Sequence, residues 1–197
     1  DLKQCVSDIL ACGVMGYPFC CPDMIGGGQW MVFHGDAIKK VNFKVIARSA
    51  QMQALMPMMQ FSLNPWRVMT RQEDKKYLDA ISKAAKIRSK YVDKILALAK
   101  SSAKTGEPIA AHMEYAFPGN GFEEIRDQWC LGGDLIVAPV LSQSDSRTVR
   151  LPPGNWRDDL GQIHAGPVTL KLKNVPIDRL PYYEKTGELK PLEIREF

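Results

Sequence analysis

One aspartate in this sequence stands where a functional side chain would be presented. A short apolar run, Tyr17 to Cys21, precedes Asp23, and glycines 26–28 follow it closely. The run has the length of a buried strand, so the pattern predicts a strand over residues 17–21 with Asp23 beyond its C-terminal end. In barrel and open α/β folds, functional side chains stand at that end of parallel strands, and glycines there allow close approach of a ligand. The alternative is that Asp23 only caps its own turn.

The residues around this segment alternate between helix and strand patterns. Apolar residues at helical spacing predict helices over residues 1–12, 43–55 and 71–100. Short apolar segments at residues 58–62 and 109–115 lie between or after these helices and predict strands. Such alternation is typical of a parallel α/β layer.

The pattern changes in the last third of the chain. From Trp129 onward, short strands are predicted at residues 135–141, 148–151, 168–172 and 180–184, with turn residues such as Pro152-Pro153-Gly154 between them. We therefore expect a small all-β unit that begins near residues 117–128.

Composition excludes several classes of protein. The 197 residues are 45% hydrophobic and 24% charged, which is typical of a globular protein. The most basic stretch, residues 75–104, also contains Asp79 and Asp93, so it indicates a solvated helix face rather than a nucleic-acid groove. No apolar run approaches the length of a membrane span. The five cysteines include no Cys-x-x-Cys pair, so we expect no metal site, no cofactor and at most two internal disulfides.

Several blocks, in order along most of the chain, resemble glycoside hydrolase family 31. The first contains Asp23-Met24-Ile25-Gly26-Gly27, which is similar to the family's Asp-Ile-Gly-Gly block. The others are residues 48–51 with 55–62, 106–109, 117–118, 127–140 and 151–156. The sequence of residues 16–27, together with Met59-Gln60-Phe61-Ser62, most resembles the branch of the myogenesis-regulating glycosidases.

The resemblance implies a fold and an activity. It implies that residues 1–120 are the C-terminal portion of a (β/α)8 TIM barrel and that residues 121–197 are a C-terminal β-sandwich domain. The family cleaves α-glycosidic bonds with retention, which requires a nucleophilic carboxylate and an acid/base carboxyl group. In the family both precede the Asp-Ile-Gly-Gly block, whereas only 22 residues precede Asp23 here. Six earlier barrel units would need on the order of 150 residues, so we expect this chain to be the C-terminal part of a longer enzyme.

The resemblance also implies candidate substrate-binding residues. Asp23 corresponds to an aspartate that accepts hydrogen bonds from hydroxyl groups of the sugar in the −1 subsite, a task that suits a carboxylate. Arg48 matches an arginine on the following helix, where a structural ion pair is the alternative. Trp30 and Trp66 are candidate sugar-stacking platforms or core residues. His112 could line the site where the family carries a charged residue, or serve as a structural histidine.

The leading hypothesis is that the chain supplies the substrate-binding wall of a retaining α-glycosidase. The alternative is a non-catalytic carbohydrate-binding or interaction module, which departures from the family pattern at Gln60, Ser62 and Ala111 favour. A third hypothesis, that the chain is an independent β-rich binding domain, accounts least well for the predicted helices. The implied partners are a carbohydrate substrate and the remainder of the barrel, not nucleic acid. The resemblance implies a secretory, lumenal or extracellular location, and the sequence leaves a homo-oligomer open.

Overall fold

The computed structural model describes residues 1–27 and 35–187 of the chain. Its helices are α1 (Leu2–Val14), α2 (Phe43–Ala54), α3 (Pro65–Val68), α4 (Lys75–Thr105) and α5 (Met113–Ala116), with 3-10 turns η2 (Gly35–Lys40) and η3 (Gln72–Asp74). Its strands are β1 (Ala110–His112), β2 (Trp129–Leu131), β3 (Leu135–Val137), β4 (Arg147–Asp158), β5 (Ile163–Leu172) and β6 (Tyr182–Thr186).

The three longer helices have clear sequence signals at their ends. Asp1 caps α1 by accepting a hydrogen bond from the Lys3 backbone N–H at 2.9 Å, and the Asn42 side chain caps α2. The helix α4 ends at Gly106, whose φ of 77° lies in the left-handed region that glycine adopts readily. The predicted helices over residues 1–12, 43–55 and 71–100 are therefore confirmed, with the largest shift at α4, which begins at Lys75 and ends at Thr105.

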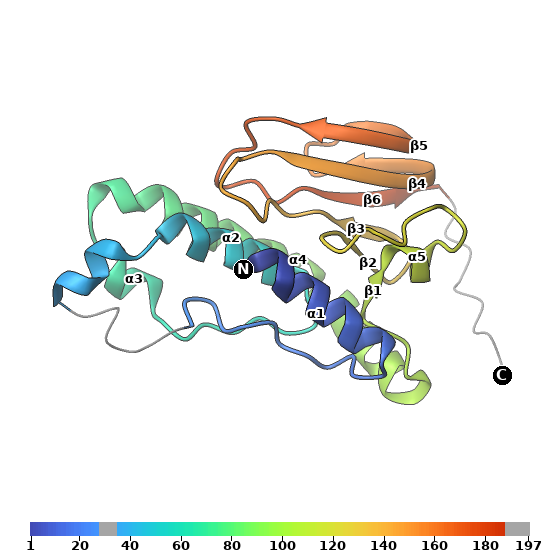
Figure 1. Ribbon diagram of the computed structural model, residues 1–197, viewed down its shortest axis with the longest axis horizontal. Coiled ribbons are helices and arrows are strands. Elements are labelled where there is room, and N and C mark those ends of the chain that lie inside the picture. The colour runs from blue at the N-terminus through green and yellow to red at the C-terminus, as the bar shows by residue number, and fades with distance from the viewer. Residues whose placement is uncertain (28–34, 188–197) are drawn as a thin grey trace.

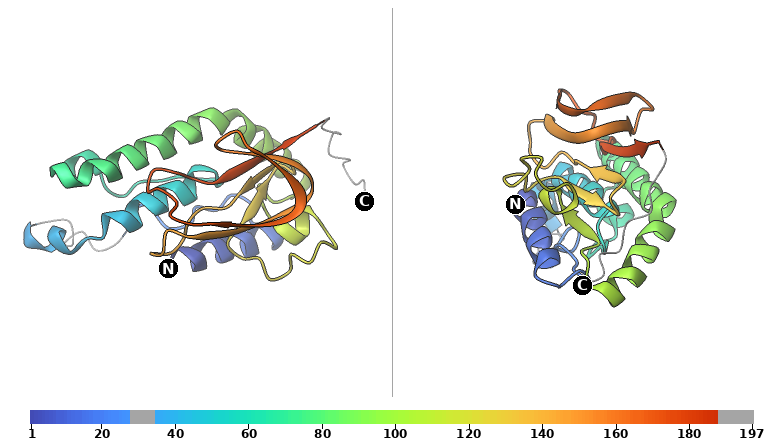
Figure 2. Two further views of the ribbon diagram at one scale, coloured as in Figure 1. Left: turned by 90° about the horizontal axis from the view of Figure 1, so that it is seen from above. Right: turned by 90° about the vertical axis from the view of Figure 1, so that its right-hand side faces the viewer.

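The strands form one six-stranded sheet in the order β1-β2-β3-β6-β4-β5, with antiparallel pairing throughout. Because side chains alternate along a strand, Trp129 and Val137 face the helices, whereas Cys130 and Ile136 face the other way. The second face packs against a separate core that includes Trp156 and Tyr183. Figures 1 and 2 show the β4–β5 hairpin as an outer layer, with α1 and α4 on the opposite side of the molecule.

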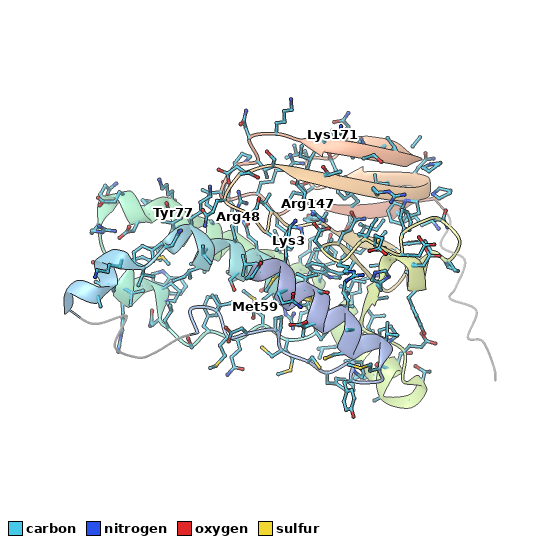
Figure 3. All side chains as sticks on the ribbon, viewed as in Figure 1. Lys3, Arg48, Met59, Tyr77, Arg147 and Lys171 are labelled. Atoms are coloured by element: carbon cyan, nitrogen blue, oxygen red, sulfur yellow. The ribbon has the colours of Figure 1, made fainter. Side chains whose placement is uncertain are left out.

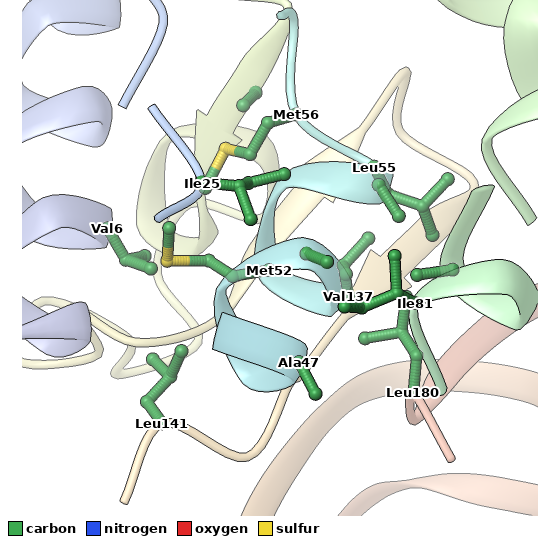
Figure 4. Close-up of a cluster of buried hydrophobic side chains, with 14 of the residues drawn as sticks. Val6, Ile25, Ala47, Met52, Leu55, Met56, Ile81, Val137, Leu141 and Leu180 are labelled. Carbon is green, nitrogen blue, oxygen red and sulfur yellow. The ribbon is translucent and has the colours of Figure 1, made fainter. Parts of the chain in front are cut away.

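The larger core lies between the helices and the sheet. Met52 and Met56 are 1% and 0% exposed, and they pack in this core among Val6, Ile25 and Val137 (Figure 4). Their flexible side chains suit an irregular interior. Met58, two residues beyond Met56, is exposed instead.

Two strand predictions need correction. Residues 17–21 form no strand, and Tyr17 and Phe19 are 67% and 53% exposed. An apolar run becomes a strand only where a neighbour accepts its backbone hydrogen bonds, and within 1–27 and 35–187 the parallel pairing falls at Ile25 and Phe61 instead. The segment 109–115 is a strand only over β1, after which the chain turns into α5.

The described residues thus combine helices with an antiparallel sheet and one isolated parallel bridge. They do not close into a barrel, and β1, from the part expected to be barrel, shares the sheet with β2.

Candidate functional site

Two short segments lie side by side just where Asp23 is presented. The Ile25 backbone N–H donates to the Gln60 carbonyl at 2.8 Å, and the Ser62 N–H donates to the Ile25 carbonyl at 3.1 Å. These bonds pair Ile25 with Phe61 in the parallel direction. The chain therefore leaves both segments at the same edge, with Gly26 and Gly27 beyond one of them and Asn64 to Trp66 beyond the other.

A buried glutamine of α2 holds both segments. Gln53 is fully buried, and its Nε2 donates to the Asp23 carbonyl. Its Oε1 accepts from the Gln60 N–H at 3.3 Å. One side-chain amide can make both bonds because it carries a donor and an acceptor. Gln53 therefore fixes the position of the Asp23 backbone relative to the Gln60 backbone.

The two glycines after Ile25 are required by close contacts. Gly26 has a φ of +73°, and a Cβ placed on it would lie 1.9 Å from Cδ2 of Leu63. A Cβ on Gly27 would lie 2.8 Å from Oδ1 of Asp23 and 2.8 Å from the Met24 carbonyl oxygen. Any side chain at these positions would push on Leu63 or on the Asp23 carboxylate.

The side chains at this edge face solvent. We call Asp23, Met24, Gln60, Ser62 and Trp66 the Asp23 edge, because all five are exposed and belong to or directly follow the paired segments. Trp66 is 63% exposed and is fixed at the start of α3 by Asn64, whose Oδ1 accepts from the Trp66 N–H at 3.1 Å. The edge combines a carboxylate, an amide, a hydroxyl group and an indole.

The Asp23 carboxylate accepts no hydrogen bond from the residues that the structure describes. No residue within 1–27 or 35–187 donates a hydrogen bond to its oxygens, whereas its backbone is held by Gln53. The pKa of the nearby Cys21 thiol is raised, first by burial and then by the negative charge of Asp23. An immobilised backbone with unoccupied carboxylate oxygens is suited to accept hydrogen bonds from ligand hydroxyl groups.

Arg48 is placed differently from Asp23. Its side chain is 1% exposed and lies between α2 and the sheet (Figure 3). Nη2 donates to Oδ1 of Asp145 at 2.8 Å and to the Val175 carbonyl at 3.0 Å, while Nη1 donates to Gln51 Oε1 at 3.0 Å. Burial acts to raise the pKa of Asp145, but hydrogen bonds from Lys44 and Arg48 outweigh it and lower that pKa. This is the arrangement of a structural ion pair, so we leave Arg48 out of the Asp23 edge.

His112 ends β1 and caps α5. Its Nδ1 accepts from the Glu114 N–H at 3.2 Å. Glu114 in turn accepts from the Phe122 N–H at 2.8 Å and from the Gly119 N–H at 2.5 Å, and these two bonds, in that order, lower its pKa. Both side chains hold the loop after β1, and within the described chain no hydrogen bond or ion pair joins either of them to the Asp23 edge.

Among the predicted site residues, the structure therefore brings Asp23 and Trp66 to one edge, and it places Arg48 and His112 elsewhere. Trp30 lies outside the described residues. Reasoning from sequence missed Gln53 and Asn64 as the residues that hold this edge. Gln53 had one signal, a polar residue within an otherwise apolar helix face, and Asn64 had another, its place before Pro65 at a helix start.

Other kinds of site are not found in this part of the chain. The described residues contain no group of three or more His, Cys, Asp or Glu side chains arranged to hold a metal ion. None of the described helices has both the length and the apolarity to cross a bilayer.

Comparison with known proteins defines the class. Residues 106–189 match the model of the glycosyl hydrolase family 31 C-terminal domain. The chain is 33% identical over 190 residues to the myogenesis-regulating glycosidase of Mus musculus, covering 92% of this chain and 26% of that protein. It is 27% identical to the isomaltosyltransferase of Sporosarcina globispora, covering 98% of this chain and 18% of the relative. The chain thus spans about a quarter or less of these relatives' lengths.

Solved structures indicate the same class of protein as the sequence comparisons. The cycloalternan-forming enzyme from Listeria monocytogenes, in complex with a pentasaccharide substrate, superposes with a TM-score of 0.79 at 25% identity. The match covers 94% of this chain and 18% of that one. Sequence and fold together place the chain among the glycoside hydrolases. It belongs to glycoside hydrolase family 31, which confirms the family resemblance of its sequence blocks.

Proposed function

We propose that the chain is part of a retaining α-glycosidase and supplies the substrate-binding wall around Asp23. The nucleophile and the acid/base carboxyl group come from outside these residues. In this proposal Asp23 accepts hydrogen bonds from hydroxyl groups of the sugar whose bond is cleaved, and it holds that sugar as positive charge develops on the ring.

The observation that carries the proposal is the Asp23 edge. The carboxylate is exposed and has no donor within the described chain, yet the backbone beneath it is fixed by Gln53 and by two glycines in close contact. A turn former that only capped its own backbone would use its oxygens locally, as Asn42 and Asn64 do. Trp66 at the same edge offers an exposed aromatic face for stacking on a sugar ring.

We further propose that residues 1–120 are the end of a (β/α)8 barrel and that residues 121–197 are a C-terminal β-sandwich domain. The parallel pairing of Ile25 with Phe61, between successive helices, supports the first part. The second core, enclosed between the curled strands, supports the other. The remainder of the barrel is the proposed partner of the exposed apolar residues Val14, Met15, Tyr17 and Phe19.

The substrate class follows from the relatives. An isomaltosyltransferase and a cycloalternan-forming enzyme are among the proteins to which the chain is similar, and an α-glucosidase of Saccharolobus solfataricus is 29% identical over 119 residues. An α-linked oligosaccharide is therefore the proposed substrate. By analogy with the family, we propose a lumenal or extracellular location for the protein.

A second function is favoured by the polar residues beside Asp23. Where the common glucosidases of the family carry an arginine and a histidine, this chain has Gln60 and Ser62. These neutral side chains bind a sugar more weakly. An edge of this kind would serve a non-catalytic carbohydrate-binding module, in which Asp23 and Trp66 bind sugar and no bond is cleaved.

Replacement of Asp23 by Ala in the complete protein tests the proposal. We expect turnover of an α-linked glucoside to fall about a hundredfold, because a charged hydrogen bond to the sugar is lost. Asp79→Ala, which removes an exposed carboxylate from α4, is the matched control and should leave turnover unchanged. Equal kinetics in the two variants would refute the role of Asp23. A complete protein that binds oligosaccharide through Asp23 but never cleaves it would favour the second function.

A further inference from the structure

Four of the five cysteines lie within residues 5–21, and the proposed function uses none of them. Cys5, Cys12, Cys20 and Cys21 are each partly exposed, whereas Cys130 is buried. Burial raises the pKa of the Cys130 thiol to about 12, so that thiol is unreactive at neutral pH. Within the described chain, the cysteine thiols that a reagent can reach therefore lie in α1 and in the segment that follows it.

The backbone brings Cys12 and Cys20 together. After α1 the chain turns back, and the Tyr17 N–H donates to the Cys12 carbonyl at 2.8 Å. The Cys20 Sγ then donates to the Tyr17 carbonyl at 3.0 Å. Tyr17 thus links the two cysteines through its own peptide groups, and the returning segment lies below α1 in Figure 1.

Besides burial, the Cys12 thiol is one cause of the raised pKa of Cys20. Burial, and then a hydrogen bond with the Cys12 thiol, raise the pKa of Cys20. Cys21 faces a different neighbour, since its pKa is raised by burial and then by Asp23. Adjacent cysteines in the sequence therefore have different surroundings, and of the two only Cys20 has a pKa that Cys12 helps to raise.

We propose that Cys12 and Cys20 are a thiol–disulfide pair that fastens the end of α1 to the segment carrying Asp23. The bond would close a loop of seven intervening residues. It would fix the chain three residues before Asp23, next to the point where Gln53 already holds the Asp23 carbonyl.

The oxidant is a small disulfide such as oxidised glutathione. The Cys12 thiolate attacks one sulfur of that disulfide, forming a mixed disulfide and releasing one glutathione thiolate. The Cys20 thiol then loses its proton to solvent and attacks the Cys12 sulfur, forming the Cys12–Cys20 bond and releasing the second glutathione. In total, two cysteine thiols are oxidised and one glutathione disulfide is reduced to two thiols.

Thiol mapping in glutathione buffers of graded redox ratio tests this pair. The purified protein is equilibrated, alkylated and digested with chymotrypsin, which cleaves after Phe19 and so separates Cys12 from Cys20. Trypsin would not do this, because no Lys or Arg lies between Lys3 and Lys39. We expect the two peptides to remain joined in oxidising buffer and to separate on reduction, with Cys12 and Cys20 losing their alkylation in parallel.

Single variants identify the partners. Cys12→Ser and Cys20→Ser should each abolish the joined peptides, whereas Cys5→Ser and Cys21→Ser should leave them unchanged. Cys5 is the matched control on the same helix, and Cys21 is the neighbour in sequence. Joined peptides that persist in Cys20→Ser but disappear in Cys21→Ser would overturn the assignment. Independent glutathione adducts at Cys12 and Cys20, with no joined peptides at any redox ratio in the wild-type protein, would overturn the pair itself.

Discussion

Gln53 and Arg48 show how buried polar residues of one helix support two different parts of the molecule. Both belong to α2 and both are almost fully buried. Gln53 holds the backbone of Asp23 and Gln60, and Arg48 holds Asp145 and the loop between β5 and β6. Gln53 fixes the backbone of Asp23, so the Asp23 side chain is not needed for that task and accepts no hydrogen bond within residues 1–27 and 35–187.

At the same scale, Gly26 should be irreplaceable for reasons of space as well as backbone conformation. Gly26→Ala places a Cβ against Leu63, whereas Gly119→Ala meets no atom within 4 Å at a similar φ of +75°. We expect Gly119→Ala to lower the free energy of unfolding by about 1 kcal/mol, and Gly26→Ala to lower it by about 2–4 kcal/mol. Urea unfolding monitored by tryptophan fluorescence measures both.

A double-mutant cycle separates the contact from the backbone cost. In a Leu63→Ala background the added Cβ has room, so Gly26→Ala should cost about as much as Gly119→Ala. If Gly26→Ala instead lowered the free energy of unfolding equally in the wild-type and Leu63→Ala backgrounds, backbone conformation alone would make this glycine necessary.

The sequence was sufficient to predict which residue types are presented here, but not how they are held. Asp23 was predicted from a carboxylate before glycines, and the structure places it in an exposed turn. The role of Gln53 depends on a contact across 30 residues, and helix periodicity carries no information about such a contact. For Arg48, the sequence offered two roles, and burial against Asp145 favours the ion pair.

At the scale of elements, the long helices were predictable, whereas the short strands were predicted only in part: β1, β3 and β6 overlap predicted strands, and β2 does not. The periodic pattern of α4 extends over 31 residues and determines the helix by itself. β2 has three residues and was missed, because its strand character comes from pairing with β1 and β3. The predicted strand at residues 17–21 was wrong for the same reason, since an apolar run does not specify its partner.

Several elements are joined by carboxylates whose pKa values are lowered. Burial acts to raise the pKa of Asp127, but Arg147 on β4 donates to it at 2.5 and 2.9 Å and lowers its pKa overall. Asp158, at the end of β4, also has a lowered pKa, because bonds from His164 and from backbone N–H groups outweigh the effect of burial. These ion pairs and hydrogen bonds hold the loop before β2 to β4 and the two strands of the β4–β5 hairpin together.

The sheet should therefore be sensitive to acid. A carboxylate with a lower pKa in the folded state contributes its stability above the unfolded pKa of about 4, and this contribution is lost as pH falls toward the folded value. We expect the urea midpoint to change little between about pH 7 and 5 and to decrease below about pH 4. Asp127→Asn should lower the midpoint at neutral pH and flatten its decrease in acid. A midpoint in this variant that decreases as steeply as in the wild type would show that Asp127 does not contribute.

At the scale of the whole molecule, two of the groups of exposed apolar side chains have different expected roles. Val14 ends α1, and Met15, Tyr17 and Phe19 follow it. The segment that contains them lies below α1 in Figure 1, on the side away from β4 and β5. Leu160 and Ile163 are also exposed, but they lie at the turn between β4 and β5. Isolated apolar residues at a turn are ordinary, whereas a continuous group indicates a covered surface.

Expressed alone, the chain should therefore self-associate through the first group. We expect Tyr17→Ser with Phe19→Ser to shift the 197-residue chain toward monomer and to reduce its binding of a hydrophobic dye, because these substitutions remove apolar surface that the proposed barrel would cover. Leu160→Ser with Ile163→Ser, which removes a similar exposed apolar area at the β4–β5 turn, should change neither property. Sedimentation velocity gives the mass distribution of each variant at equal concentration. If the turn variant were the one that became monomeric, the contact would involve the sheet, and the surface beside Asp23 would no longer be the expected position of the remaining barrel.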